Sequence, residues 1–240
     1  MATAMFNRTN IISRCVSDIK RSSVHYYSLH KVKKVFSKYF PSQPPEPPYD
    51  HICQLGDPVL RTKATPVDTK AIQTHEFQKV LGQLERVMKK HELVGISAPQ
   101  IGLPWQVCAI EVTQQSLNSV DPEIQKLCGM EIVPLTYFIN PKMEIKNPAE
   151  VTFVEMCGSI AGFRAEVPRA KEVEVKALNR LGEAFTWSAK GWPARIIQHE
   201  FDHLQGILYI DKMDRSTFEC CFWEEVNLNR GKISLRYYVQ

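Results

Sequence analysis

The sequence predicts an α+β fold, in which antiparallel strands and separate helices build one core. Residues 171–189 alternate apolar and polar side chains on both sides of a turn, which is typical of an antiparallel hairpin. Helical periodicity occurs elsewhere, over residues 74–92 and 192–205, without regular alternation between helix and strand. This order favours an α+β arrangement over the repeated βαβ units of a parallel sheet.

The composition is that of a globular protein. The chain has 240 residues, of which 44% are hydrophobic and 23% charged, enough for one core and a short tail. These proportions exclude a collagen-like, coiled-coil or fully disordered chain. No apolar run approaches the roughly 18 residues that cross a bilayer, so we expect no transmembrane helix.

The formal net charge of +4 is unevenly distributed. Residues 1–40 carry eight Lys and Arg side chains, one acidic side chain and six serines, whereas the rest of the chain holds 22 basic and 25 acidic side chains. Apolar residues are scattered through the basic segment, without the continuous apolar stretch of a secretory signal. The pattern predicts an organellar transit segment over residues 1–40, and a disordered basic arm that binds nucleic acid is the alternative.

A proline-rich stretch follows this basic segment. Five prolines fall between residues 41 and 48, and such a run stays extended instead of joining a packed core. We therefore expect a linker over residues 41–50 and a folded domain over residues 51–240, with packed structure from near Ile52. The seven cysteines are odd in number and irregularly spaced, which predicts no disulfide framework and fits a reducing compartment.

The first half of the domain is expected to contain one helix and two strands. Residues 74–92 place apolar side chains at three- and four-residue spacing, which predicts an amphipathic helix. A loop with two glycines and two prolines is expected over residues 95–104, and a strand over residues 106–112. Residues 114–129 are polar without a clear period and predict a surface insertion.

The second half is expected to contain more strands and a buried helix. The helix over residues 192–205 is apolar on most sides, with Pro193 in its first turn and Gly206 as a stop, so we expect it to be buried. The other expected elements are a strand over 132–139 that ends at Asn140-Pro141, a strand or hairpin over 143–155, the hairpin of 171–178 with 184–189, and a short helix within 216–227.

The buried helix contains the pattern His199-Glu200-Phe201-Asp202-His203. Histidines at positions i and i+4 lie on one helix face, where both imidazoles reach a single metal ion, and Glu200 is placed to take a proton from the attacking water. The alternative is two core histidines with a solvated acid between them. Four polar side chains would be costly to bury in an apolar helix without a purpose, which favours the metal interpretation.

A third metal ligand is then required, and two sources are open. Downstream of the helix, Glu219, Glu224 and Glu225 sit in a charged stretch that is expected to be exposed. Upstream, Cys157 follows an apolar run, and a thiolate with two imidazoles would leave an open coordination position for catalysis. Taken alone, Cys157 is better explained as a core thiol, because a free cysteine packs as a small hydrophobic residue.

A glycine-containing segment, Gly95–Gln100, is the third feature. A glycine lets the backbone approach a ligand closely, and the Gln100 amide offers a hydrogen-bond donor. Taken alone, the segment is better explained as a loop that connects a helix to a strand.

Together, three motifs resemble those of peptide deformylase: Gly95–Gln100, Glu155–Ser159 and His199–His203. Ala161-Gly162-Phe163 and Gly191-Trp192 are similar to the mitochondrial branch of that family. The resemblance covers about residues 52–215. It implies an α+β, peptide-deformylase-like fold, with small antiparallel sheets around a central metal-binding helix.

The resemblance also implies a role for each site residue. Cys157, His199 and His203 would bind one divalent metal ion, Fe2+ or Zn2+, with Co2+ as a further candidate. Glu200 would transfer the proton, and the Gln100 amide and the Gly158 N–H would hold the oxyanion. The remaining assignments are main-chain alignment of the peptide by Gly95 and Ile96, a methionine pocket of Val94, Phe153, Trp192 and Ile196, a structural pair of Glu155 with Arg169, and an orienting role for Asp202.

The implied function is hydrolysis of the formyl group from formyl-methionine at the N-termini of nascent polypeptides in the mitochondrial matrix. The mitochondrial ribosome is a further partner, monomer and homodimer stay open, and neither nucleic-acid binding nor membrane insertion is expected. Three positions depart from the family pattern: Leu93, Met156 and Gly158. If Met156 narrows the groove, the alternative is a catalytically weak deformylase-like protein that binds formylated N-termini. A metallopeptidase is a third hypothesis, which Cys157 and Gln100 argue against.

Overall fold

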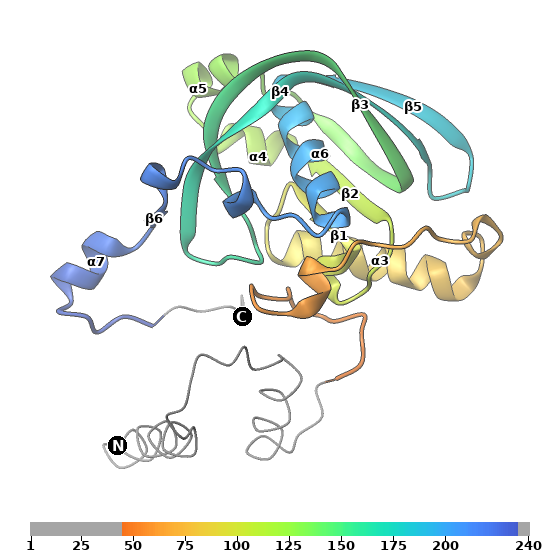
Figure 1. Ribbon diagram of the computed structural model, residues 1–240, viewed down its shortest axis with the longest axis horizontal. Coiled ribbons are helices and arrows are strands. Elements are labelled where there is room, and N and C mark those ends of the chain that lie inside the picture. The colour runs from red at the N-terminus through yellow and green to blue at the C-terminus, as the bar shows by residue number, and fades with distance from the viewer. Residues whose placement is uncertain (1–44, 235–240) are drawn as a thin grey trace, which may run out of the picture. The chain divides into compact units, whose positions relative to one another are not determined.

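The computed structural model describes residues 45–234, and every structural statement below refers to this part of the chain (Figure 1). The transit segment predicted over residues 1–40 lies outside it, as do residues 41–44 of the predicted linker. The helices are α3 (His75–Lys90), α4 (Gln114–Asn118), α5 (Pro122–Cys128), α6 (Gly191–Leu204) and α7 (Trp223–Leu228). The strands are β1 (Gly95–Ser97), β2 (Val107–Val112), β3 (Val133–Met156), β4 (Phe163–Leu178), β5 (Ala184–Lys190) and β6 (Glu219–Cys220). Short 3-10 turns cover Pro58–Arg61, Thr69–Ala71, Ala98–Ile101, Tyr209–Asp211 and Arg215–Thr217.

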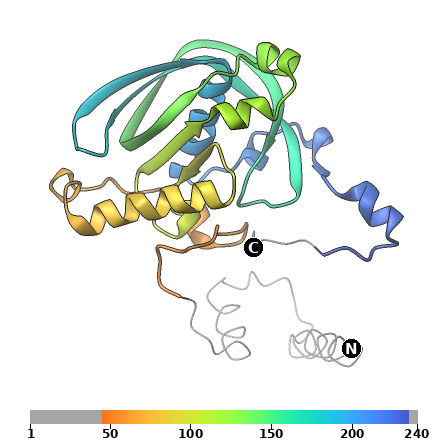
Figure 2. The same cartoon turned by 180° about the vertical axis from the view of Figure 1, so that it is seen from behind.

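The six strands of the described residues form one antiparallel sheet. They follow the order β1-β2-β3-β4-β5, and β6 pairs with β4. The long strands β3 and β4 pair from Ile139 with Leu178 to Met156 with Arg164. Figures 1 and 2 show these strands curving around α6, so that the helix lies inside the bend of the sheet. The predicted α+β class is confirmed, and the strands expected in several small sheets belong to a single continuous one.

The central helix α6 forms as the sequence predicts. It contacts each of the strands β1 to β5. Pro193 stands in its first turn, where a helix N–H has no partner to lose, and Gly206 follows its end with a φ of 74°. Ile196 and Ile197 are buried against apolar side chains of the sheet. The helix is thus held on nearly all sides.

The amphipathic helix α3 also matches its prediction. The Thr74 side chain accepts a hydrogen bond from the Phe77 N–H at 3.3 Å and caps the helix N-terminus. Its apolar face is buried in one core cluster with β1 and β2, and α3 lies along the lower edge of the domain in Figure 2. The buried side chains of this face are Phe77, Leu81, Leu84, Val87 and Met88.

The strand β3 does not end at Asn140-Pro141, so that prediction is wrong. Pairing with β4 resumes at Lys142 after a register shift, and Asn140 adopts a φ of 52°, a conformation that asparagine tolerates. The Asn140 side chain accepts from the Val67 N–H at 2.8 Å and donates to the Val67 carbonyl at 2.9 Å. This bulge accommodates the proline, and residues 143–155 continue the same strand instead of forming a hairpin.

Three shorter segments also differ from the predictions. Residues 114–129 form two helices, α4 and α5, each too short to show a helical period and capped by Thr113 and Asp121. The expected loop over 95–104 starts with the edge strand β1. Within residues 216–227 the chain first forms β6, and the helix α7 begins only at Trp223.

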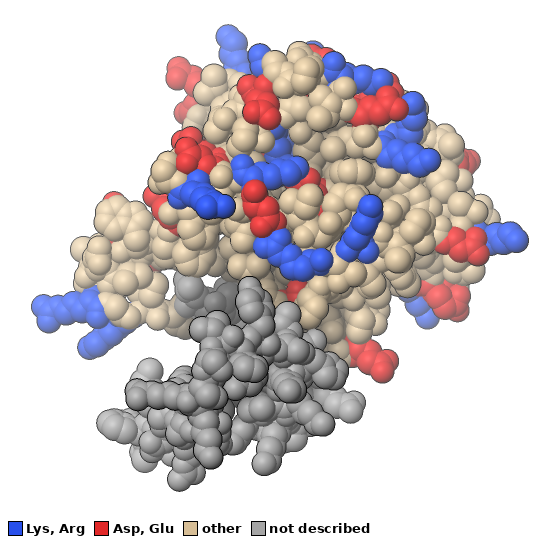
Figure 3. All heavy atoms as spheres, in the orientation of Figure 1, with Lys and Arg blue, Asp and Glu red and all other residues tan. Residues whose placement is uncertain are grey.

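The described chain makes contacts with the domain from Tyr49 onward. The Tyr49 N–H donates to the Ile101 carbonyl at 2.9 Å, and the Cys53 N–H donates to the Gln100 carbonyl at 2.8 Å. The end of the predicted linker therefore already binds to the domain. Among the described helices, none is long and apolar enough to span a membrane. Figure 3 shows Lys and Arg interspersed with Asp and Glu on the face it presents.

Candidate active site

Four polar side chains of α6 lie inside the bend of the sheet. His199 and His203 stand one turn apart, with ring centroids separated by 5.1 Å, and Glu200, Asp202 and His203 are buried. Such burial is costly unless each group has a partner. His199, Asp202 and His203 find partners at the end of β3 and on β4, in Glu155, Arg169 and Cys157.

Cys157 directly follows β3, which ends at Met156. Because β3 curves around α6, Cys157 faces the two histidines. Its side chain is buried, and its Sγ lies 3.3 Å from the His203 Nε2. The sulfur of Cys157 and one nitrogen each of His199 and His203 lie within 4.8 Å of one another. The structure therefore brings the three predicted metal ligands together.

This donor set fits a divalent metal ion. Tetrahedral zinc with bonds of about 2.0–2.3 Å holds its donors roughly 3.5 Å apart. The Cys157 Sγ and His203 Nε2 are 3.3 Å apart, and all three donors lie within 4.8 Å of one another. The His199 Nδ1 lies 2.9 Å from the Glu155 Oε2, which leaves its Nε2 to face the sulfur. The His203 Nδ1 is buried and has no hydrogen-bond partner among the described residues. One soft sulfur and two imidazoles suit Zn2+ or Fe2+.

The electrostatics of the site favour a thiolate. Burial opposes ionisation of Cys157, but the neighbouring His203 and His199 outweigh it and hold the pKa of the thiol well below its ordinary value. Burial likewise opposes the charge on His199, yet its contacts with Cys157 and Glu155 raise its pKa well above the ordinary value. The deprotonated sulfur is the form that binds metals.

Glu155 is the centre of a buried ion network. Arg169 binds it through two parallel hydrogen bonds, Nε to Oε1 and Nη2 to Oε2, both 2.8 Å long. The Arg195 Nη1 donates to the same Oε1 at 2.7 Å. Burial opposes the charge on Glu155, but Arg169 and His199 stabilise it, and the pKa of the carboxyl is lowered. The Glu155–Arg169 pair thus exists and also orients His199.

Asp202 extends this network away from the three metal donors. Its carboxylate accepts from the Arg169 Nη1, and its other oxygen accepts from the Lys212 Nζ at 2.7 Å. The carboxylate therefore links α6 to β4 and to the chain beyond α6. It orients Arg169 instead of a histidine.

Glu200 has a different environment from the other acids. Its side chain is 4% exposed, and its Oε2 has no hydrogen-bond partner among the described residues. Burial raises the pKa of Glu200 to about 7, although His203 and His199 act in the opposite direction. A carboxyl group with such a pKa can accept and release a proton near neutral pH.

Gly95 is required by the close approach of β1 to α6. A Cβ atom at this position would lie 2.6 Å from the Glu200 Oε1 and 2.9 Å from the Ile196 Cγ2. The Glu111 N–H donates to the Val94 carbonyl, so Val94 is hydrogen-bonded to β2. In an antiparallel pair, successive residues of one strand point their N–H and C=O groups alternately toward and away from the partner strand. The N–H and C=O of the next residue, Gly95, therefore point away from β2, toward the free edge of β1. By the same alternation the Ile96 main chain faces β2, and its side chain is buried in the core.

Gln100 presents its amide nitrogen to the site. Its Oε1 accepts from the Ser97 N–H at 2.9 Å and from the Ser97 hydroxyl at 3.2 Å, which fixes the amide orientation. Its Nε2 therefore faces the Ser159 hydroxyl at 3.3 Å and the Cys157 Sγ at 3.8 Å. The N–H of Gly158 forms no hydrogen bond within residues 45–234. Two donors thus lie beside the sulfur.

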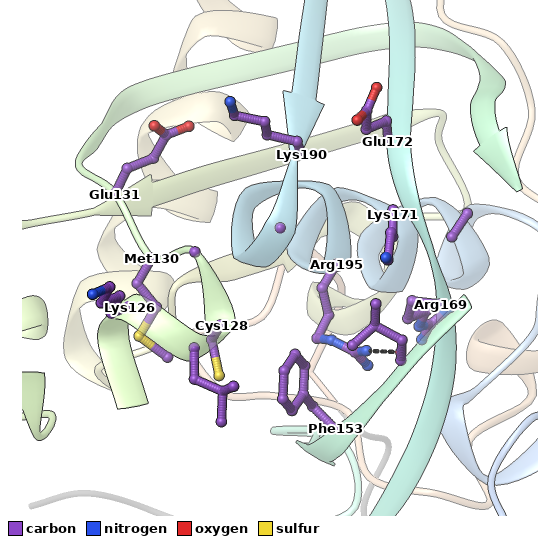
Figure 4. Close-up of a pocket in the computed structure, with 15 residues that line it drawn as sticks. Lys126, Cys128, Met130, Glu131, Phe153, Arg169, Lys171, Glu172, Lys190 and Arg195 are labelled. Atoms are coloured by element: carbon purple, nitrogen blue, oxygen red, sulfur yellow. Dashed lines mark hydrogen bonds between the residues drawn. The ribbon is translucent and has the colours of Figure 1, made fainter. Parts of the chain in front are cut away.

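A cavity of about 310 Å³, called the catalytic cavity below, opens beside these groups. Val94, Trp192 and Ile196 line it, as predicted for the methionine pocket, together with Gly95 and Glu200. Phe153 does not line it. Its ring faces a neighbouring cavity, under the guanidinium of Arg195 (Figure 4). The remaining residues that line the catalytic cavity are Glu92, Leu93, Gln100, Val154, Glu155, Met156, Cys157, Gly158, Arg195 and His199.

The three residues that differ from the family pattern line this cavity without filling it. Met156 is 59% exposed at its rim and does not have a positive φ, so the position does not require a glycine conformation. Gly158 is held by the Gln54 side chain, whose Nε2 donates to the Gly158 carbonyl at 2.8 Å. Leu93 lies next to Gly158: a Cβ atom added to Gly158 would lie 3.4 Å from the Leu93 Cδ1.

Two residues of the site were not found from the sequence. Arg195 belongs to the ion network, and an arginine in an otherwise apolar helix was an available signal, because a buried charge needs a partner. Gln54 supports Gly158 from a position 104 residues away. Nothing local in the sequence points to that contact.

Comparisons with known proteins agree on one family. The family model for polypeptide deformylase matches residues 49–219. The chain is 47% identical over 184 residues to a mitochondrial peptide deformylase of Homo sapiens, covering 77% of this chain and 76% of that protein. It is 39% identical over 167 residues to the chloroplastic/mitochondrial peptide deformylase 1A of Arabidopsis thaliana, covering 70% and 62%. A Met-Ala-Ser-bound structure of a class I type b peptide deformylase from Acinetobacter baumannii superposes with a TM-score of 0.61 at 26% identity, covering 68% of this chain and 96% of that one.

Proposed function

Because this chain belongs to the peptide deformylase family and is an enzyme of that activity, we propose that it removes the N-formyl group from the N-terminal formyl-methionine of newly made mitochondrial polypeptides and releases formate. One observation carries the proposal: three metal donors, a buried carboxyl group without a hydrogen-bond partner, and the N–H donors of Gln100 and Gly158 line the same cavity. The family model and the human relative confirm the family resemblance seen in the sequence.

The metal would be held by Cys157, His199 and His203. A divalent ion there would supply a Lewis acid for the attacking water and for the formyl oxygen. Glu155 holds the His199 ring in the orientation that ligation requires, and Arg169 and Arg195 hold Glu155 in turn. Fe2+, Zn2+ and Co2+ all remain candidates for the native ion.

Proton transfer is the role of Glu200. Its carboxylate takes a proton from the attacking water and then delivers it to the nitrogen of the departing amine, so the group returns to its starting state. A pKa of about 7 suits both directions of this transfer. The Glu200 side chain is itself buried, which limits exchange of this proton with solvent between the two steps.

Charge that develops on the formyl oxygen is met by two N–H donors. The Gln100 amide is held by Ser97, and the Gly158 N–H points from a segment anchored by Gln54. Preorganised donors of this kind stabilise a tetrahedral oxyanion without reorganising during the reaction.

The peptide is expected to lie along the free edge of β1. The main-chain groups of Gly95 face this edge, where an added strand can form hydrogen bonds. Val94, Trp192 and Ile196 then receive the methionine side chain in the catalytic cavity. The A. baumannii relative with Met-Ala-Ser bound supports a peptide of this kind.

Two further features support a mitochondrial substrate. The N-terminal 40 residues have the composition of a transit segment, and the human relative is a mitochondrial enzyme. Translation that begins with formyl-methionine supplies the formylated N-termini. Action at the mitochondrial ribosome, in the matrix, as a monomer or a homodimer, belongs to the same proposal.

Formate release from formyl-Met-Ala-Ser tests the proposal. The purified chain is loaded anaerobically with Fe2+, Zn2+ or Co2+, and formate is measured together with metal content. Stoichiometric metal with rapid formate release is expected. Metal binding with no formate would favour the deformylase-like binding protein, and cleavage of an internal peptide bond would favour the metallopeptidase.

A further inference from the structure

The buried ion network reaches the protein surface at Lys212. This lysine follows the 3-10 turn Tyr209–Asp211, and its main-chain N–H donates to the Tyr209 carbonyl at 3.0 Å. Its Nζ donates to the Asp202 Oδ1 at 2.7 Å. The Lys212 side chain is 42% exposed, whereas that of Asp202 is only 7% exposed. The pair therefore links the surface to the interior of the domain.

Asp202 has one partner for each of its carboxylate oxygens. Among the described residues, its Oδ2 accepts from Arg169 and its Oδ1 accepts from Lys212 alone. A buried carboxylate without a partner is costly, so the second oxygen depends on the lysine. Asp211, the acid next to Lys212 in the chain, is paired instead with Arg61.

Four contacts connect Lys212 to a predicted metal ligand. Beyond Asp202, the path continues through Arg169, which donates to both Asp202 and Glu155. The Glu155 Oε2 then lies 2.9 Å from the His199 Nδ1. Positive and negative charges alternate along this path. The Arg169 and Glu155 side chains are 3% and 4% exposed, so solvent screens the inner part of the path very little.

The lysine acts on the way in which Arg169 is shared between two carboxylates. With Lys212 in place, part of the Asp202 charge is neutralised from the outer side, and Arg169 forms two parallel hydrogen bonds with Glu155. Without the lysine, Asp202 would attract Arg169 with its full charge and compete with Glu155 for the guanidinium. Glu155 would then hold the His199 ring less firmly.

We propose that Lys212 is a remote positioning residue for the metal site. Its charge keeps Arg169 on Glu155 and thereby holds His199 in the orientation that ligation requires. The inference rests on the proposed function, because it takes His199 as a ligand of the divalent ion. Lys212 does not line the catalytic cavity, so it would act through these contacts and not on the substrate.

Co2+ binding measures this effect independently of catalysis. The full-length chain is freed of metal and titrated with Co2+ in competition with a chelator, and the absorption bands of the bound ion report its coordination geometry. Lys212→Met keeps the unbranched stem and removes the charge. Loss of a group that orients a ligating histidine lowers metal affinity 10–100-fold, and for this exposed outer member we expect about tenfold, with altered bands. Lys212→Arg should match the unmodified chain.

Two comparisons show whether the effect passes through Asp202. In the Asp202→Asn background, Lys212→Met should cause no further loss of Co2+ affinity, because the carboxylate on which the lysine acts is absent. Lys146→Met is the matched control and should leave the affinity unchanged. Lys146 has a similar exposure of 45%, and its partners, Glu144 and Glu174, do not belong to the network.

Urea unfolding of the metal-free proteins separates a positioning role from a purely structural one. A loss of stability with unchanged Co2+ affinity and unchanged bands would overturn the proposal. Equal losses of affinity with Asp202 and with Asp202→Asn would also overturn it. If Lys212→Met does not fold, Lys212→Gln, which removes the charge and keeps an N–H donor, decides by the same criteria.

Formate release from formyl-Met-Ala-Ser, measured on the same proteins, keeps this result distinct from a failure of the proposed function. The expected Co2+ affinities without formate release would support the positioning role and refute the proposed function. Formate release with a Co2+ affinity that Lys212→Met leaves unchanged would support the function and refute the positioning role. A chain that takes up no Co2+ would overturn both.

Discussion

Replacing Glu200 with glutamine separates two consequences of burying this carboxyl group. The substitution preserves size and removes the ability to transfer a proton. General acid–base catalysis contributes on the order of 10²–10⁴-fold, so kcat for formate release should fall by about 10³-fold. The metal content should stay unchanged, because none of the three donors is altered.

The same variant should be more stable without metal, in a pH-dependent way. Burial raises the pKa of Glu200 from an ordinary 4.5 to about 7, so between these values the folded chain binds more protons than the unfolded chain. The stability of the Glu200 protein relative to the variant therefore falls as the pH rises through this window. At 1.36 kcal/mol per pH unit, the full penalty is about 3 kcal/mol above pH 7 and disappears below about pH 4.5.

Two assays check this pair of effects. Formate release is measured on metal-loaded protein, and urea unfolding is measured on chelator-treated protein at pH 5 and pH 8. Glu150→Gln, at an exposed position of β3, is the control and should change neither quantity. A variant rate within tenfold of the unmodified rate would refute the proton-transfer role. Equal stability gains at both pH values would refute the argument from burial.

Three other substitutions test the rest of the site. Cys157→Ser should lower metal affinity at least 100-fold in equilibrium dialysis, whereas Cys220→Ser should not, and equal metal content would remove the sulfur from the site. Gly95→Ala should reduce kcat/KM at least 100-fold, because its Cβ would overlap the buried Glu200 carboxyl group. Gly82→Ala on α3 is the control: its Cβ would meet only the Arg86 Nη1, at an ordinary contact distance of 3.6 Å, and it should instead raise stability by about 0.5–1 kcal/mol in urea unfolding. Arg169→Met should destabilise the protein by about 3–5 kcal/mol, since it leaves two buried carboxylates without their shared partner, and a loss below about 1 kcal/mol would contradict that role.

Local patterns predicted the elements that carry the site. The i, i+4 histidines and the apolar periodicity of α6 depend only on helix geometry, so the helix and the approach of its two histidines could be expected from the sequence. The hairpin of β4 and β5 follows from strict alternation and a turn. The sequence alone does not fix Cys157 as a ligand, because its distance from the helix depends on the path of the whole sheet.

The predictions that the structure contradicts, at Asn140-Pro141 and Phe153, depend on contacts between distant residues or on the exact position of one residue. The Asn140-Pro141 pair predicts a strand end. In the structure, the Asn140 side chain forms two hydrogen bonds with the main chain of Val67, 73 residues away, and these stabilise a bulge through which β3 continues. The sequence predicts Phe153 in the methionine pocket, whereas the structure has its neighbour Val154 lining the catalytic cavity and Phe153 lining the neighbouring one. In a strand, a displacement of one residue sends the side chain to the other face. No single-chain pattern shows which of the two faces a particular cavity.

The ion network that joins α6 to β3 and β4 also has a consequence for the maturation of the enzyme. In an unfolded chain, the His199–His203 pair is present as a local sequence, but the sulfur 42 residues before His199 is not near it, and no carboxylate orients the rings. The complete ligand set exists only after the sheet has closed over the helix. Metal acquisition is therefore expected to follow folding, so the ion must be supplied where the chain folds, and bound metal reports that folding is complete.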